Sequence, residues 1–162
     1  RTLAEYYKTV WVPEFGRMYA EGKMYSADYG NWNSTEFEYI AREQNLLEDE
    51  LIKRCNKILI CDTDSFATGL WHERYMGYMS DNVQRLNDSR KCDLYFLTDV
   101  DMPFVQDGTR DGEHIRSNMN KRFEEELRKK NKPYVVLSGS HDSRLKKAIM
   151  ACNEILSANN SL

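Results

Sequence analysis

The sequence predicts a three-layer α/β fold built around a parallel sheet. Short apolar runs alternate with longer segments of helical periodicity, and such an order joins parallel strands through right-handed crossovers. The central run is Lys57–Asp64, whose Ile58–Cys61 part is apolar without alternation, as in a strand buried on both faces. The chain has 162 residues, 41% of them hydrophobic, which suits one domain with its own core. We therefore expect a single domain over residues 1–162.

The first elements are short. Thr2–Tyr7 has the pattern of the last turns of a helix, and Val10–Pro13 that of a brief strand ended by its proline. A short helix is expected to run to Glu21, because Gly22 favours a helix end. Lys23–Asn33 has no clear period and is expected to be a loop.

A long helix is expected next. Asn33 and Glu36 have the spacing of a capping box, and the apolar stripe that follows continues to Cys55. A further helix is expected after Asp64 and should end at Gly77. A second, shorter helix is expected over Asp81–Leu86. The remaining elements are a strand at Leu94–Leu97, a helix carried by Ile115, Met119, Phe123 and Leu127, a strand at Pro133–Leu137, and a last helix capped by Asp142.

Charge and cysteine usage narrow the class of protein. The net charge of −3 argues against a general nucleic-acid or membrane-surface binder, and no apolar run approaches the roughly 20 residues that span a bilayer. The cysteines form no CxxC pair, so we expect reduced core cysteines and a cytoplasmic protein. His72, His114 and His141 share no spacing and are expected at the surface.

Two carboxylates follow the central strand directly. Ligands of open parallel sheets bind beyond the carboxyl ends of the strands, which is where Asp62 and Asp64 fall. The alternative is that Asp62 only caps the next helix, because the side-chain oxygen of a single aspartate there would satisfy backbone donors. Placing two carboxylates on either side of Thr63 costs free energy unless a cation or a hydrogen-bond donor binds them. We therefore favour a functional site.

Other polar residues point to phosphoryl transfer. The segment of about 104–116 contains glycines together with Arg110 and Arg116, as a lid that closes over a phosphate group would. The alternative is a solvated loop with two surface arginines. Asp62 and Asp64 could hold Mg²⁺ through water, and Glu14, which follows the neighbouring strand, could act as a general base.

Four further residues each allow two interpretations. Glu14 and Arg17 are either site residues or a structural ion pair. Trp32 either stacks on a planar ligand or covers the core. Gln44 either binds a ligand or satisfies a neighbouring backbone group. A fifth residue, Glu48, has a single interpretation: it is expected to reach solvent at the margin of its helix.

Six short motifs in this order resemble the ribosylnicotinamide kinase domain of NadR-type proteins, an AAA-like P-loop kinase family. The motifs are Trp11-Val-Pro-Glu-Phe-Gly-Arg17, Phe37-x-x-Ile-Ala-x-x-Gln44, Cys61-Asp-Thr-Asp64 with Thr68 beyond, Asp93-Leu-Tyr-x-Leu97, Val105-x-Asp-Gly-x-Arg110 and Pro133-Tyr-Val-Val-x-Ser-Gly139.

The resemblance implies a thymidylate-kinase-like P-loop fold that uses ATP and Mg²⁺ to phosphorylate the 5′-hydroxyl of nicotinamide riboside. Asp62 would be the Walker B-type carboxylate, which holds Mg²⁺ through water. Glu14 and Arg17 would face the nucleoside. The remaining roles would be substrate contact for Asp64, Trp32 and Gln44, and lid function for Arg110 and Arg116.

The glycine-rich loop GxxxxGK[ST] of this family is absent from the sequence. We expect it, and the first strand, immediately upstream of Arg1, which makes the chain an amino-terminally incomplete kinase domain. NadR-type proteins often carry an adenylyltransferase domain ahead of the kinase. Two alternatives stay open: a kinase of another nucleoside or nucleotide on the same fold, and a non-catalytic nucleotide-binding module. Partners of this domain are then small molecules, without direct nucleic-acid or membrane binding.

Overall fold

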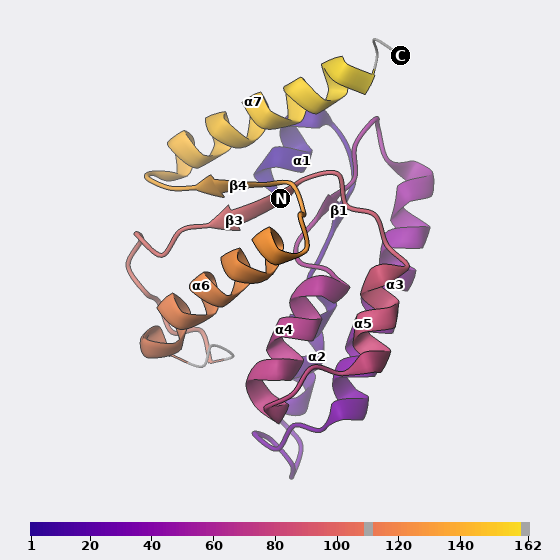
Figure 1. The fold of residues 1–162 in the computed structure, drawn as a ribbon, viewed down its shortest axis with the longest axis vertical. Coiled ribbons are helices and arrows are strands. Elements are labelled where there is room, and N and C mark those ends of the chain that lie inside the picture. The colour runs from indigo at the N-terminus through magenta and orange to yellow at the C-terminus, as the bar shows by residue number, and fades with distance from the viewer. Residues whose placement is uncertain (109–111, 160–162) are drawn as a thin grey trace. The chain divides into compact units, whose positions relative to one another are not determined.

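The computed structural model describes residues 1–108 and 112–159, and the chain divides into two compact units, Arg1–Lys91 and Cys92–Leu162. Each unit contains one two-stranded parallel sheet and its own helices (Figure 1). The mixed α/β composition and the parallel pairing agree with the sequence-based expectation. A single continuous parallel sheet within a three-layer α/β fold stays a prediction.

The first unit has a small sheet and a larger helical part. Its elements are α1 (Thr2–Tyr7), β1 (Trp11–Val12), α2 (Phe15–Lys23), α3 (Ser34–Leu51), the 3₁₀ turn η1 (Ile52–Arg54), β2 (Ile60–Cys61), α4 (Ser65–Met76) and α5 (Asp81–Asp88). Helices α3, α4 and α5 pack against one another around Phe37, Ala41 and Val83. The helix that was expected to run to Glu21 continues for two more residues, to Lys23, because Gly22 does not adopt the left-handed conformation that ends a helix.

The other helices of this unit begin and end at residues with capping side chains or a left-handed glycine. The capping box is present: the side chain of Asn33 accepts from the Glu36 backbone N–H, and the Glu36 carboxylate accepts from the Asn33 backbone N–H. Gly77 ends α4 in the left-handed conformation, with φ of 78°. Ser80 caps α5 by accepting from the backbone N–H of Val83.

The buried strand expected at Ile58–Cys61 is the main correction in this unit. Only Ile60–Cys61 is paired, with Trp11 opposite Ile60 and Val12 opposite Cys61. No residue of the apolar run Ile58–Cys61 is buried, and Cys61 is exposed. Burial on both faces needs covering elements on both sides, and within this unit β2 has β1 as its sheet partner.

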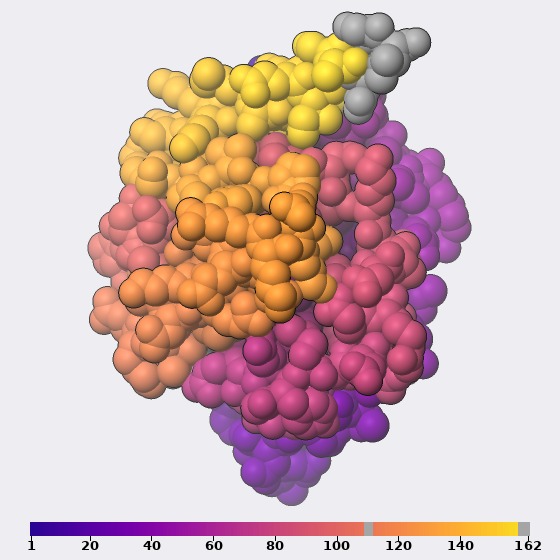
Figure 2. Space-filling model, in the orientation of Figure 1, coloured from indigo at the N-terminus to yellow at the C-terminus, as the bar shows by residue number. Residues whose placement is uncertain are grey.

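The second unit is a strand pair covered by two helices. Strands β3 (Tyr95–Thr98) and β4 (Tyr134–Leu137) run parallel, with Tyr95 opposite Tyr134 and Thr98 opposite Leu137. Helix α6 (Glu113–Lys129) packs on β3 and α7 (His141–Asn159) on β4. In Figure 2 these helices, in orange and yellow, make up much of the visible surface of this unit.

The cap of α7 differs from the prediction. Asp142 lies inside the helix, and the hydroxyl of Ser140 instead accepts a hydrogen bond from the backbone N–H of Ser143 at 3.3 Å. A serine just before the first helical residue caps as well as an aspartate does, so composition alone does not distinguish the two positions.

Candidate functional site

The carboxyl ends of β1 and β2 lie side by side, because the two strands are parallel and in register. The backbone N–H of Asp62 donates to the carbonyl of Val12 at 2.8 Å, which extends the pairing one step beyond the strands. Helix α2 starts directly after β1 with Glu14 as its N-cap, and α4 starts after β2 with Asp64 as its N-cap. The expected site residues Glu14, Asp62 and Asp64 therefore follow the same edge of one sheet.

The two aspartates have different surroundings. Asp64 is the capping residue, since its Oδ1 accepts from the backbone N–H of Ala67 at 3.0 Å. The alternative in which Asp62 caps α4 is thus wrong. Asp62 is exposed, and its carboxylate has no hydrogen-bond or ion-pair partner among residues 1–108 and 112–159. The side chain of Asp62 is accordingly available to a ligand or cation.

Thr63, between these aspartates, has a strained backbone. Its φ of 76° lies in the left-handed region, where a β-branched residue is an outlier. Such a conformation costs on the order of 1 to 3 kcal/mol and persists only where its surroundings hold it. The turn from Asp62 to Asp64 is therefore a strained segment at the strand end.

Glu14 and Arg17 form an ion pair, with 3.5 Å between Glu14 Oε2 and Arg17 Nε. Glu14 does not use its side chain to cap α2. Both side chains remain about one third exposed, at 33% for Glu14 and 38% for Arg17, so the pair is accessible from solvent. The structural ion pair is present, and a role in the site stays a prediction.

Gln44 is buried between the two strand-end turns. Its Oε1 accepts from the backbone N–H of Phe15 at 2.9 Å, and its Nε2 lies 3.5 Å from the carbonyl oxygen of Thr63. Only 1% of its surface is exposed. Of the two sequence-based interpretations, satisfaction of neighbouring backbone groups is what these contacts provide.

Glu48, one helical turn beyond Gln44 on α3, is not at the solvent margin as expected. Its Oε1 is buried and has no hydrogen-bond partner among the described residues. Burial, with a smaller contribution from the negative charge of Asp64, raises the pKa of Glu48 to about 7, although Arg90 and a hydrogen bond from Gln44 act in the opposite direction. The sequence signal for Glu48 was that it interrupts the apolar stripe of this helix.

Trp32 packs into the aromatic part of the first unit's core. Its ring centroid lies 5.3 Å from that of Phe37, 5.6 Å from Tyr75 and 6.1 Å from Tyr19. The ammonium of Lys23 lies 5.1 Å from the same ring. These contacts match the interpretation in which Trp32 covers the core, and stacking on a ligand stays a prediction.

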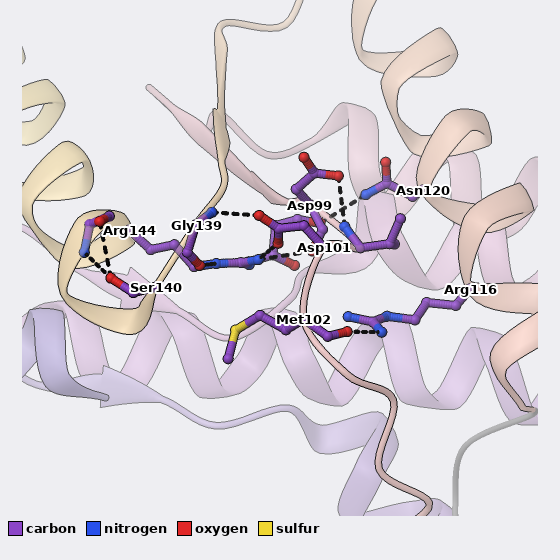
Figure 3. Close-up of polar contacts among 11 residues, drawn as sticks. Asp99, Asp101, Met102, Arg116, Asn120, Gly139, Ser140 and Arg144 are labelled. Carbon is purple, nitrogen blue, oxygen red and sulfur yellow. Dashed lines mark hydrogen bonds and ion pairs between the residues drawn. The ribbon is translucent and has the colours of Figure 1, made fainter.

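The second unit has a polar cluster at its own strand ends, which sequence reasoning missed (Figure 3). Asp101 pairs with Arg144 and also accepts from the backbone N–H of Gly139 at 2.5 Å. Arg144 in turn donates to the carbonyl oxygens of Gly139 at 3.0 Å and Asp99 at 3.2 Å. The hydrogen bond from Gly139, followed by the charge of Arg144, holds the pKa of Asp101 below its ordinary value.

This cluster ties the β4–α7 turn to the segment after β3. A sequence signal existed, because Asp99 and Asp101 have the same spacing as Asp62 and Asp64. In the same view, Arg116 Nη1 donates to the carbonyl of Met102 at 2.5 Å. Arg110, the other expected lid arginine, lies outside the described residues.

Two expectations about single residues are wrong. His72 is fully buried, with its Nε2 2.7 Å from Ser34 Oγ and its Nδ1 2.9 Å from the carbonyl of Tyr78. These partners satisfy both ring nitrogens, so burial costs little. Core burial holds for Cys152 but not for Cys61 and Cys92, which are exposed.

Searches of the described residues give two further results. Within residues 1–108 and 112–159, His, Cys, Asp and Glu side chains form no group of three that could hold a metal ion. No helix in the same ranges combines the length and the apolar character needed to cross a membrane.

Comparisons with known proteins identify the family of the chain. The family model of the AAA domain matches residues 1–144, so the chain belongs to the AAA domain family. That membership defines the class as a P-loop NTPase fold, which binds nucleotides.

Among individual proteins, the chain is similar to the trifunctional NAD biosynthesis/regulator protein NadR of Escherichia coli K12 and of Salmonella typhimurium LT2. Each is 27% identical over 157 residues, which is 95% of this chain and 38% of the relative. The chain thus spans less than half the length of these curated relatives. The resemblance to NadR-type proteins is confirmed.

Proposed function

We propose that this domain transfers a phosphoryl group from ATP to the 5′-hydroxyl of nicotinamide riboside and so forms nicotinamide mononucleotide. Membership of the AAA domain family supports nucleotide binding, and the similar NadR proteins are named for NAD biosynthesis. The observation that carries the proposal is the shared strand edge at which Glu14, Asp62 and Asp64 follow β1 and β2. In this reaction the 5′ oxygen forms a bond to the γ-phosphorus, the bond to the ADP oxygen breaks, and one proton is released.

The residues of the edge suit distinct roles. Glu14 is the general base that accepts the proton of the hydroxyl, with Arg17 beside it facing the nucleoside. Asp64 and Trp32 are substrate-side candidates from the sequence, whereas the Gln44 side chain is occupied by backbone groups of the two strand-end turns. Arg110 and Arg116 belong to the proposed lid of about residues 104–116, where guanidinium groups would bind phosphate oxygens.

Mg²⁺ fits one position of this edge. The exposed carboxylate of Asp62 offers the hard oxygen donors that Mg²⁺ prefers, and Mg²⁺ commonly takes its other ligands from water and from substrate phosphates. The ion would supply neutralisation of phosphate charge. Asp62 would orient it through water.

The test is a substrate panel on the longest natural polypeptide that contains this chain. Nicotinamide riboside, thymidine and a nucleoside monophosphate are offered with ATP and Mg²⁺, and phosphorylated product is measured by chromatography. We expect nicotinamide riboside to give the highest kcat/KM. Faster turnover of another acceptor would assign a different kinase. ATP binding by calorimetry without turnover of any acceptor would replace the kinase by a binding module.

A further inference from the structure

We propose that Gln44 is a positioning residue: it holds the turn that carries Glu14 and the turn that carries Asp62 and Asp64 in one fixed arrangement. This inference rests on the proposed function, because those turns carry its candidate catalytic groups. Gln44 itself would touch neither the nucleoside nor the nucleotide.

The first part of the argument is connectivity. Phe15, which donates to Gln44 Oε1 at 2.9 Å, is the first residue of α2 and follows Glu14 directly. Thr63, whose carbonyl lies 3.5 Å from Gln44 Nε2, sits between Asp62 and Asp64. One side chain of α3 therefore contacts both strand-end turns, which otherwise meet through the β1–β2 backbone pairing.

The second part is the orientation of the amide. The Phe15 N–H can only donate, so it requires the oxygen of Gln44, and the Thr63 carbonyl requires the nitrogen. Both partners thus select the same orientation, and a flipped amide would lose both of them.

The third part is strain. Thr63 keeps a left-handed backbone that a β-branched residue adopts only when its surroundings impose it. Gln44 is the buried side chain that contacts the carbonyl of this strained residue. Loss of the contact would free the turn to relax and would displace the aspartates on either side. A displacement of about 1 Å at a reacting group lowers turnover by about a hundredfold.

A direct contact between Gln44 and a ligand would break existing hydrogen bonds and is therefore unfavourable. Both ends of its amide already have protein partners, and the side chain is 1% exposed. A ligand would have to displace the Phe15 N–H or the Thr63 carbonyl, and either group would then lose its partner at a partly buried position.

The test replaces the buried amide by an apolar side chain of similar size, Gln44→Met. The matched control is Asn45→Leu, on the next residue of the same helix. Asn45 is also buried and donates to a backbone carbonyl, that of Leu86 at 3.2 Å, but it contacts neither strand-end turn. Both proteins are assayed for kcat and KM, for stability by urea unfolding, and for backbone amide hydrogen exchange by NMR.

We expect Gln44→Met to lower kcat at least tenfold with little change in the KM for nicotinamide riboside, and to speed exchange of the Phe15 amide selectively. Asn45→Leu should lose stability to a similar degree and keep its kcat. A Gln44→Met enzyme with a raised KM and an unchanged kcat would show a direct substrate contact and overturn the proposal. Equal losses of kcat in both variants would also overturn it.

Two precautions keep the result decisive. If Gln44→Met does not fold, Gln44→Asn makes a smaller change: it keeps the amide but is one methylene group shorter, so it cannot span the Phe15 N–H and the Thr63 carbonyl. The proposal expects kcat to fall in Gln44→Asn, and a normal kcat would overturn it. If the unaltered protein phosphorylates no acceptor, the proposed function fails, while unchanged exchange of the Phe15 amide in Gln44→Met would separately show that the bridge does not hold that turn.

Discussion

The ammonium of Lys23 and the carboxylate of Glu36 form an ion pair that is almost closed to water, with side-chain exposures of 6% and 12%. Glu36 also accepts from the hydroxyl of Tyr19 at 3.1 Å and from the backbone N–H of Asn33 at 2.9 Å. The same carboxylate therefore completes the capping box of α3 and neutralises a buried lysine beneath Trp32.

Lys23→Met should destabilise the protein by about 3 kcal/mol, because it leaves the carboxylate of Glu36 buried without its cation. Lys53→Met is the control, since Lys53 pairs with Glu50 at the surface, and should cost less than about 1 kcal/mol. Urea unfolding at neutral pH measures both. Similar costs for the two variants would contradict the special role of the buried pair.

The same pair gives the protein a dependence on acid. Burial alone would raise the pKa of Glu36, but hydrogen bonds from Lys23, Asn33 and Tyr19 outweigh burial and hold the pKa below its ordinary value. The lowered pKa of Glu36 stabilises the folded protein at any pH above the ordinary pKa of a glutamate. This stabilisation is lost as the pH falls through the lowered pKa. In Glu36→Gln the free energy of unfolding should therefore fall less as the pH is lowered than it does in the unaltered protein.

Glu48 should produce the opposite slope. Its pKa rises from 4.5 to about 7 on folding, so the folded protein binds a proton that the unfolded chain releases between those values. The stabilisation is complete below pH 4.5 and is lost as the pH rises towards 7. Glu48→Gln removes this titration and should make the protein more stable at pH 8, by on the order of 2 kcal/mol.

The measurement for Glu48 is urea unfolding at pH 5 and pH 8. Glu50→Gln is the control, because Glu50 is an exposed residue of the same helix. A stability difference between the two pH values that is the same in Glu48→Gln and in the unaltered protein would show that Glu48 is not the titrating group.

Asp62→Asn tests the proposed chemistry at the strand edge. The amide keeps the size of the side chain and removes its charge, so turnover of nicotinamide riboside should fall by a factor of roughly 100 or more while the unfolding curve stays in place. Asp28→Asn, at an exposed position of the loop between α2 and α3, should leave turnover unchanged. Near-normal turnover by Asp62→Asn would remove Asp62 from the mechanism.

Thr63→Gly should relieve the backbone strain of its turn. Glycine adopts φ of 76° without penalty, and this gain exceeds the added freedom of the unfolded chain by up to about 1 kcal/mol. The same replacement at Thr35, in the first turn of α3, should instead destabilise, since glycine disfavours helix. Opposite signs in urea unfolding support the strain at Thr63, and a large loss of stability in Thr63→Gly would contradict it.

Signals carried by neighbouring residues made parts of the fold predictable. The capping box of Asn33 and Glu36, and the helix end at Gly77, depend on contacts within a few residues, and both are present. The aspartates at the end of β2 were likewise found from a strand followed by a carboxylate pair.

Features that depend on distant partners were not predictable in the same way. The apolar run that contains β2 lacks the burial it seemed to require, because burial is set by which elements cover a strand. The partners of Gln44 are separated from it by 29 and 19 residues, and two partners of Arg144, Asp99 and Asp101, come from another strand end. His72 gave no local sign of burial, because Ser34 is 38 residues away.

Helix α3 has a consequence for how the sequence can change. It carries Glu36 near its start and Gln44 just over two turns later, and each side chain has partners outside the helix. One inserted residue between them would rotate the later part of the helix by about 100° and shift it by about 1.5 Å. Substitutions on the exposed face of this interval are therefore tolerable, whereas any change in its length would uncouple the buried ion pair from the strand-end turns.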